Sequence, residues 1–148
     1  MNEDFRDILA ALLRSGARFL VVGAHAMAAH GVPRATGDLD LWVARDEDNA
    51  ARVFSALKGF GAPVTALGLI LADLTRADHV IQLGLPPRRI DILTGISGVG
   101  FDDAWVDRLT HSVGDLSVPF LGRAALVHNK RAAGRAKDLA DLEALGER

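Results

Sequence analysis

Two aspartates in a stretch that otherwise resembles a buried strand are the first residues able to do chemistry. The stretch is GDLDLWV, residues 37–43, and its carboxylates belong to Asp38 and Asp40. Residues two apart in a strand point to the same face, with Cα atoms about 6.5–7 Å apart. Like charges this close repel, and each resists desolvation unless a cation lies between them. The pair therefore indicates a divalent cation site.

Spacing alone is a weak signal, because 15 of the 148 residues are aspartates. A second acidic triplet, Asp46-Glu47-Asp48, opens a predicted helix, where acidic side chains stabilise the N-terminus. We interpret this triplet as capping without chemistry.

Asp91, in RRIDIL, is the third candidate carboxylate. Ile90 and Ile92 would bury one face of its strand and leave Asp91 on the other. If the two strands pair, the carboxylates of Asp38, Asp40 and Asp91 converge. Mg²⁺ prefers such hard oxygen ligands, and two ions can hold the attacking and leaving oxygens of a phosphoryl transfer. The alternative is that the three aspartates decorate a solvated sheet face.

The segment just before the aspartate pair favours the cation site. FLVVG predicts a strand that ends at Gly23, and a helix begins at Ala24. A strand–glycine–helix turn exposes backbone N–H groups and the positive end of the helix dipole, which suits phosphate. Triphosphate and metal would then be held by adjacent elements.

Residues 19–43, FLVVGAHAMAAHGVPRATGDLDLWV, resemble the signature of the DNA polymerase β-like nucleotidyltransferase superfamily. In that signature a strand ending in Gly-Gly or Gly-Ser leads into a helix, then Asp-x-Asp, with a third Asp on a later strand. The closer resemblance is to a small bacterial branch related to AbiEii-type toxins of toxin–antitoxin systems. That branch carries His-Gly, Arg-x-Thr and Asp-hydrophobic-Asp, and a tail similar to residues 126–145. The resemblance covers most of the chain.

The resemblance implies a metal-dependent transfer of a nucleoside monophosphate from an NTP to a protein or RNA hydroxyl. Asp38 and Asp40 would bind Mg²⁺ or Mn²⁺, and Asp91 would complete the site and help deprotonate the acceptor. The implied nucleotide-binding positions are Gly23, Ala24, Arg34, Thr36 and Lys130. A cognate antitoxin or toxin is an implied partner, and dimerisation that completes the site is left open.

Ala24 departs from the family pattern, which has Gly or Ser at this position. Its methyl group would crowd a phosphate, and it lacks the hydroxyl of serine. This departure favours a second hypothesis, a binding or interaction module that has the fold without turnover. Hydrolysis of a phosphoester, with the same carboxylates, is a third. For Arg34 and Thr36, contact with the nucleotide or acceptor and stabilisation of the loop are equally open.

Composition sets few limits. The net charge of −2 provides no overall attraction to nucleic acid or membrane, and the absence of cysteine fits a reducing cytosol. No signal-peptide pattern and no apolar run of about 20 residues is present, so we expect a cytoplasmic protein without membrane contact. The length predicts one nucleotidyltransferase-like domain over 1–148, with a helical tail from about 122.

Helical and strand periodicities alternate along the chain, which predicts the α/β (α+β) class: a mixed β-sheet with packed helices, in a polymerase-β-like nucleotidyltransferase fold. Residues 62–77 fit either a short helix or a strand, and Pro119 suggests an edge strand. The predicted helices are 3–15, 24–31, 46–61, 101–109 and 123 to the end with a break near Gly134, and the predicted strands are 18–23, 38–43, two within 79–94, and 116–121.

The remaining candidate residues have structural interpretations. His25 and His30, five apart, are poorly spaced for chelation from one helix face. Lys137 and Asp141 are predicted to form an i, i+4 ion pair, and Asp138 to cap its helix.

Overall fold

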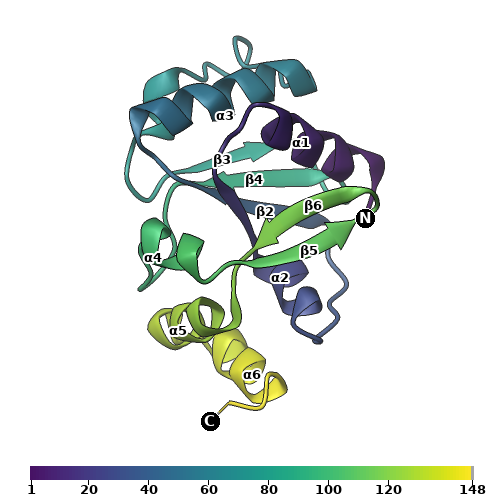
Figure 1. Ribbon diagram of the computed structural model, residues 1–148, viewed down its shortest axis with the longest axis vertical. Coiled ribbons are helices and arrows are strands. Elements are labelled where there is room, and N and C mark those ends of the chain that lie inside the picture. The colour runs from purple at the N-terminus through teal and green to yellow at the C-terminus, as the bar shows by residue number, and fades with distance from the viewer. Residues whose placement is uncertain (148) are drawn as a thin grey trace.

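A computed structural model of the chain describes residues 1–147, so Arg148, the end of the predicted tail, lies outside the described residues. The sheet has six strands in the order β3-β4-β2-β1-β6-β5 (Figure 1). The strands are β1 Phe19–Val22, β2 Asp38–Val43, β3 Val80–Leu83, β4 Arg89–Leu93, β5 Leu109–Val113 and β6 Leu116–Phe120. The helices are α1 Glu3–Arg14, α2 Gly23–Ala29, α3 Glu47–Phe60, the 3₁₀ turn η1 Leu71–Leu74, α4 Phe101–Val106, α5 Arg123–Ala133 and α6 Ala136–Ala144.

The sheet is mixed, and β2 pairs in parallel with β4. β1 runs antiparallel to β2, and β3 runs antiparallel to β4. On the other side of β1, β6 pairs in parallel through Val21 and Phe120, and β5 completes the sheet antiparallel to β6. The two aspartate-bearing strands are therefore direct neighbours.

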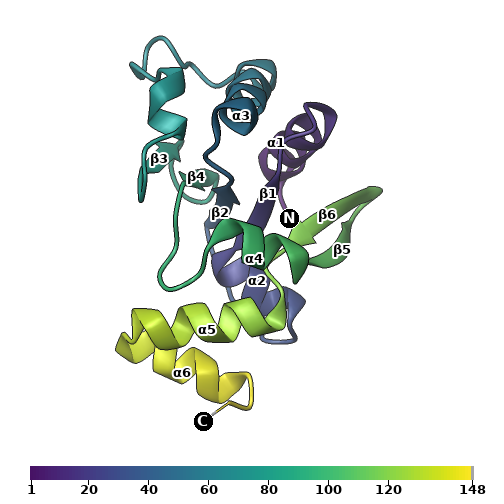
Figure 2. The same ribbon diagram turned by 60° about the vertical axis from the view of Figure 1, so that its left-hand side comes forward.

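Each face of the sheet buries its own apolar cluster. Leu39, Leu41 and Ile92 belong to the cluster that packs with α1 and α3, whereas Leu20 and Trp42 belong to the cluster with α2 and α5. Figures 1 and 2 show α1 and α3 together on one side of the sheet, and α5 and α6 on the other. Alternation thus commits the leucines of β2 and the isoleucines of β4 to one face.

Local signals fix the helix ends. Asp46 is the N-cap of α3, and its Oδ2 accepts a hydrogen bond of 3.0 Å from the Asn49 N–H. This confirms the capping interpretation of the 46–48 triplet. Gly61 and Gly134 end α3 and α5 in the left-handed conformation that glycine adopts without strain.

The predicted helices and strands are confirmed, except that the C-terminal helix ends at Ala144 and does not continue through 145–147. η1 shows that 62–77 contains a short helical turn rather than a strand. The edge position suggested by Pro119 is wrong, because β6 lies between β1 and β5. β1 engages β6 beyond the proline, where the Leu121 N–H donates to the Val21 oxygen at 2.9 Å, so a donor at Pro119 is not required on that side. The sequence reading missed β5, whose central residues are polar and exposed.

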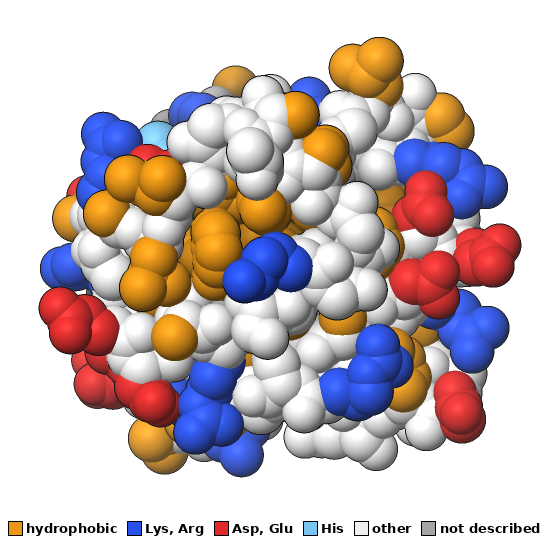
Figure 3. Space-filling view, turned by 90° about the horizontal axis from the view of Figure 1, so that it is seen from above, with side chains coloured by type: hydrophobic (Ala, Val, Ile, Leu, Met, Phe, Trp, Pro, Cys, Tyr) orange, Lys and Arg blue, Asp and Glu red, His pale blue; other side chains and the backbone are white. Residues whose placement is uncertain are grey.

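The surface adds two observations. Acidic and basic side chains are interspersed on the face shown in Figure 3, with apolar side chains between them, so this face has no extended field of one sign. Within residues 1–147, no helix has both the length and the apolar character required to cross a membrane.

Candidate active site

The register between β2 and β4 brings the three predicted carboxylates to one place. Asp40 lies directly opposite Asp91, and Asp38 lies opposite Arg89. All four side chains share one face, because the leucines and isoleucines between them enter the cluster on the other face. Asp91 is 6% exposed, and Asp38 and Asp40 are half-buried. The structure therefore assembles the predicted trio, while the roles assigned to its members stay predictions.

Arg89 provides the positive charge in this cluster. Its Nη2 lies 3.0 Å from Asp38 Oδ2 and 3.1 Å from Asp91 Oδ2. The other oxygens, Asp38 Oδ1 and Asp91 Oδ1, are buried and accept no hydrogen bond from any described residue. The cluster is therefore only partly neutralised and partly hydrogen-bonded.

This environment raises the pKa of Asp40 to about 6. Burial is the largest cause, followed by the charges of Asp91 and Asp38, whereas the charge of Arg89 acts in the opposite direction. A carboxylate with a raised pKa beside two others indicates excess negative charge. The cluster therefore favours an additional cation.

Position 23 requires a glycine because the backbone there lies against the carboxylate of Asp40. It joins β1 to α2 with φ of +68°, and a Cβ atom at this position would overlap Asp40 Oδ2. Any other residue would carry both backbone strain and a steric clash with the carboxylate. The glycine thus lets the chain turn directly over the aspartate pair.

A cleft of about 310 Å³ opens beside the aspartates. All five positions implied to bind nucleotide line this cleft, together with Asp38 and Asp40. The described lining residues are Gly23, Ala24, Met27, Arg34, Ala35, Thr36, Asp38, Asp40, Lys130, Lys137 and Asp141. The volume and the mixture of charged and backbone groups suit a small polar ligand.

The two lysines of the cleft differ in their surroundings. Lys130 is 8% exposed, and its Nζ lies 2.9 Å from Asp141 Oδ2 and 3.3 Å from Asp138 Oδ1. Arg34 also contacts Asp141. The predicted pair between Lys137 and Asp141 is therefore wrong, because Asp141 is taken by other cations. Lys137 is exposed and forms no ion pair with any residue from 1 to 147.

The reasoning from sequence missed Lys137 as a cleft residue. Its available signal was that it is one of three lysines in the chain. Asp138 accepts a hydrogen bond of 3.1 Å from the Arg135 N–H, so it caps α6 from within the first turn. Thr36 Oγ1 accepts from the Asp38 N–H at 3.1 Å, and this contact fixes the start of β2.

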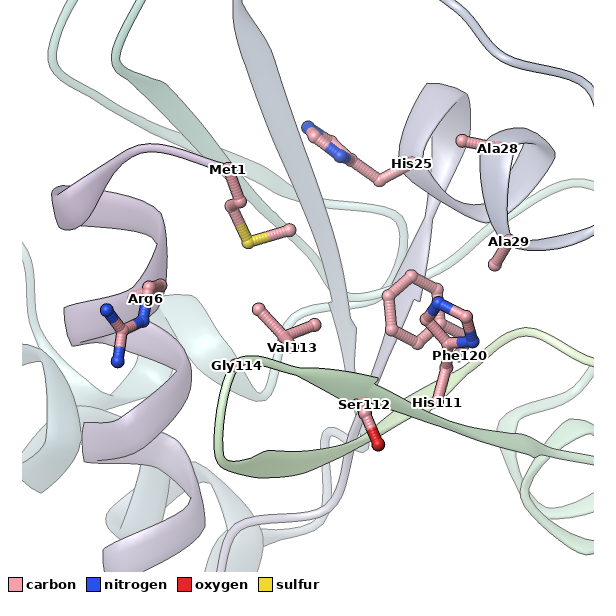
Figure 4. Close-up of a pocket in the computed structure, with 10 residues that line it drawn as sticks. All are labelled: Met1, Arg6, His25, Ala28, Ala29, His111, Ser112, Val113, Gly114 and Phe120. Carbon is pink, nitrogen blue, oxygen red and sulfur yellow. The ribbon is translucent and has the colours of Figure 1, made fainter.

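A second cavity, of about 380 Å³, lies between α2, the N-terminus and the β5–β6 hairpin (Figure 4). Its described lining includes His25, His111 and Ser112 but none of the three aspartates, so it is not the carboxylate site. Burial, and then the charge of the N-terminal amino group, lower the pKa of His25. His30 Nε2 lies 2.7 Å from the carbonyl oxygen of Leu121, which fits a structural role for this histidine.

The donor set suits a hard cation such as Mg²⁺, because three carboxylates converge and two buried oxygens lack partners within the described chain. As the side chains stand, no group of three or more His, Asp or Glu among residues 1–147 has metal-binding spacing. Binding of one ion by all three carboxylates therefore requires at least one of their side chains to move.

Comparison with solved structures supports the fold. The chain matches a protein from Thermotoga maritima described as a "putative nucleotidyltransferase", with a TM-score of 0.60 and 18% sequence identity. The match covers 96% of this chain and 88% of that chain. No protein-family model and no curated protein matches the sequence. The predicted fold class is therefore confirmed as nucleotidyltransferase-like, and the AbiEii-related branch stays a prediction.

Replacing Asp40 with Asn tests the electrostatic strain. Between the unfolded pKa of 3.8 and the folded value of about 6, the native chain binds more protons than the unfolded chain. The free energy of unfolding must then fall as pH rises through this window and stay reduced above it. From pH 4 to pH 7, the free energy of unfolding of Asp40→Asn should therefore rise relative to that of wild type by about 1–2 kcal/mol, after allowance for partial exposure of the carboxylate.

Urea titrations in chelator-containing buffer at these two pH values measure this difference. Asp103→Asn, at an exposed aspartate of α4, is the matched control and should follow the wild-type pH profile. Parallel profiles for wild type and Asp40→Asn would contradict the assignment of strain to Asp40.

Proposed function

We propose that this chain is a metal-dependent nucleotidyltransferase that moves a nucleoside monophosphate from an NTP to a hydroxyl of a protein or RNA. The observation that carries the proposal is that Asp38, Asp40 and Asp91 lie together on neighbouring strands. They lie beside a cleft that Gly23 also lines. The nucleotidyltransferase-like fold around them adds support.

Asp38, Asp40 and Asp91 would hold the divalent ions, Mg²⁺ or Mn²⁺, with their carboxylate oxygens. When bound, such ions supply charge neutralisation at phosphate oxygens. The buried oxygens without partners in the described chain, Asp38 Oδ1 and Asp91 Oδ1, supply sites for this interaction. The preference of Mg²⁺ for oxygen ligands matches the chemistry of the trio.

The chain's own residues would position the reactants. Gly23 lets the backbone lie against the phosphates, and the acceptor hydroxyl would lose its proton to Asp91. The hydroxyl oxygen bonds to the α-phosphorus while the bond from that phosphorus to the bridging oxygen breaks, and pyrophosphate leaves. Positioning and charge neutralisation then account for the catalysis without a covalent enzyme intermediate.

Charge pairing in the cleft changes the predicted roles of the basic residues. Lys130 forms ion pairs with Asp138 and Asp141 of α6, so we propose that it holds α5 and α6 together. Lys137 is the exposed lysine of the cleft and is assigned to the triphosphate. Arg34 borders the cleft and would contact phosphate on release from Asp141.

A binding module without turnover is the second candidate. Ala24 lines the cleft with a methyl group where the family pattern has Gly or Ser, and two of the three described basic residues there are already ion-paired. This favours weak nucleotide binding. Membership of a toxin–antitoxin pair, a cognate partner and a cytoplasmic location stay predictions.

Transfer activity is tested with α-labelled NTPs, Mg²⁺ and total cellular RNA and protein as acceptors. Wild type should label one class of acceptor, and Asp91→Asn should reduce the rate at least about 100-fold, since it removes a metal ligand and the proton acceptor. Asp103→Asn is the control with unchanged rate. Absence of label with every NTP, together with no Mg-dependent heat on nucleotide titration, would exclude the proposal.

The two lysines should separate binding from stability. Lys137→Met should weaken the Kd for Mg-NTP about 10-fold, which is about 1.4 kcal/mol, without a change in Tm. Lys130→Met should lower the free energy of unfolding by about 2 kcal/mol, because the buried carboxylate of Asp138 loses one charged partner and keeps Arg135. Titration calorimetry and thermal unfolding measure both quantities, and equal effects of the two variants would contradict the assignment.

A further inference from the structure

Arg89 carries the chain's own positive charge within the carboxylate cluster, and the proposed reaction gives it no role. A single nitrogen, Nη2, reaches Asp38 Oδ2 across the strand pair at 3.0 Å and Asp91 Oδ2 along its own strand at 3.1 Å. The side chain is 30% exposed, so these ion pairs are partly shielded from solvent. Arg89 thus links the two strands at the site.

Each of the two carboxylates contacts Arg89 through one of its oxygens. Arg89 takes the Oδ2 atoms and leaves Asp38 Oδ1 and Asp91 Oδ1 buried and without a hydrogen-bond partner in the described chain. Arg89 Nε is also buried, and no described residue accepts its hydrogen bond. Each carboxylate is therefore held through one oxygen, and its second oxygen retains its capacity to accept a ligand.

The charges permit a cation in addition to the guanidinium. The three negative charges of Asp38, Asp40 and Asp91 outnumber the single positive charge of Arg89. The excess negative charge suits a divalent cation. Arginine fits this position because its guanidinium is planar and charged at every working pH. A lysine ammonium would supply charge without the fixed plane.

We infer that Arg89 is a positioning residue, which holds the Oδ2 atoms of Asp38 and Asp91 so that their Oδ1 atoms are presented to a divalent metal ion. The inference rests on the proposed function in one respect, namely that the trio binds metal. Groups that orient metal ligands in this way typically change metal affinity about 10–100-fold when they are removed.

The opposite role, in which the guanidinium competes with the metal, makes the opposite prediction. A competitor must leave before metal binds, so its removal would tighten metal binding. The unpartnered Oδ1 atoms argue for positioning, because the metal can bind them while the Oδ2 contacts persist.

Titration of the whole chain with Mn²⁺ alone, followed by calorimetry and by electron paramagnetic resonance of free Mn²⁺, tests the inference. Arg89→Met should weaken the Kd for Mn²⁺ about 10-fold or more, and Arg89→Lys should give an intermediate loss. Arg88→Met is the matched control, because Arg88 precedes Arg89 and pairs with Asp4 at 3.1 Å, away from the trio. Its Kd should stay within about 2-fold of wild type.

An unchanged or tighter Kd in Arg89→Met would overturn the inference, and a tighter one would establish competition. Arg89→Lys keeps the test valid if the methionine variant does not fold, since a wild-type affinity in Arg89→Lys would overturn the positioning role. Failure of wild type to bind Mn²⁺ would instead remove the proposed function itself. The two failures are therefore distinguished by the wild-type titration.

Discussion

Repulsion among three carboxylates on one face of two neighbouring strands is the constraint on which this structure depends. The carboxylates cannot turn away, because Leu39, Leu41, Ile90 and Ile92 must enter the core on the opposite face. A slip of one residue in either strand would expose those apolar residues, so burial fixes the register and the register fixes the repulsion. Arg89 offsets the repulsion in part, and burial together with the charges of Asp91 and Asp38 raises the pKa of Asp40 to about 6.

The elements around the trio are consistent with a site that is incomplete on its own. Gly23 accepts a positive φ to bring the backbone against Asp40, and four buried polar atoms, three of them in the cluster, have no partner within residues 1–147. Local violations of this kind are common at functional sites, where stability is lost to prepare an interaction with a ligand. The α5–α6 pair closes the cleft through Lys130, which fixes the acidic residues of α6.

Much of this arrangement follows from short-range patterns. Alternation in DLDLWV and RRIDIL predicts which side chains share a face, and Gly23 predicts the turn before α2. The pairing of β2 with β4 can also be predicted, because both strands carry aspartates flanked by apolar residues. Asp46 as a helix cap follows from its place at the start of an amphipathic stretch.

The remaining features depend on contacts between distant segments. Asp141 pairs with Arg34, 107 residues away, and with Lys130, so an i, i+4 rule misassigns its partner. Lys137 then has no ion-pair partner among residues 1–147, which no local pattern predicts. β5 lacks apolar alternation because it is an exposed edge, and Pro119 lies inside the sheet because β1 engages β6 beyond it.

A crystal structure in saturating Mn²⁺, with the ion located by its anomalous scattering, tests the central claim most directly. We predict Mn²⁺ in direct coordination with oxygens of Asp38, Asp40 and Asp91, with Arg89 still bound to the Oδ2 atoms of Asp38 and Asp91. Mn²⁺ absent from these carboxylates, with Arg89 as the sole cation between them, would contradict it.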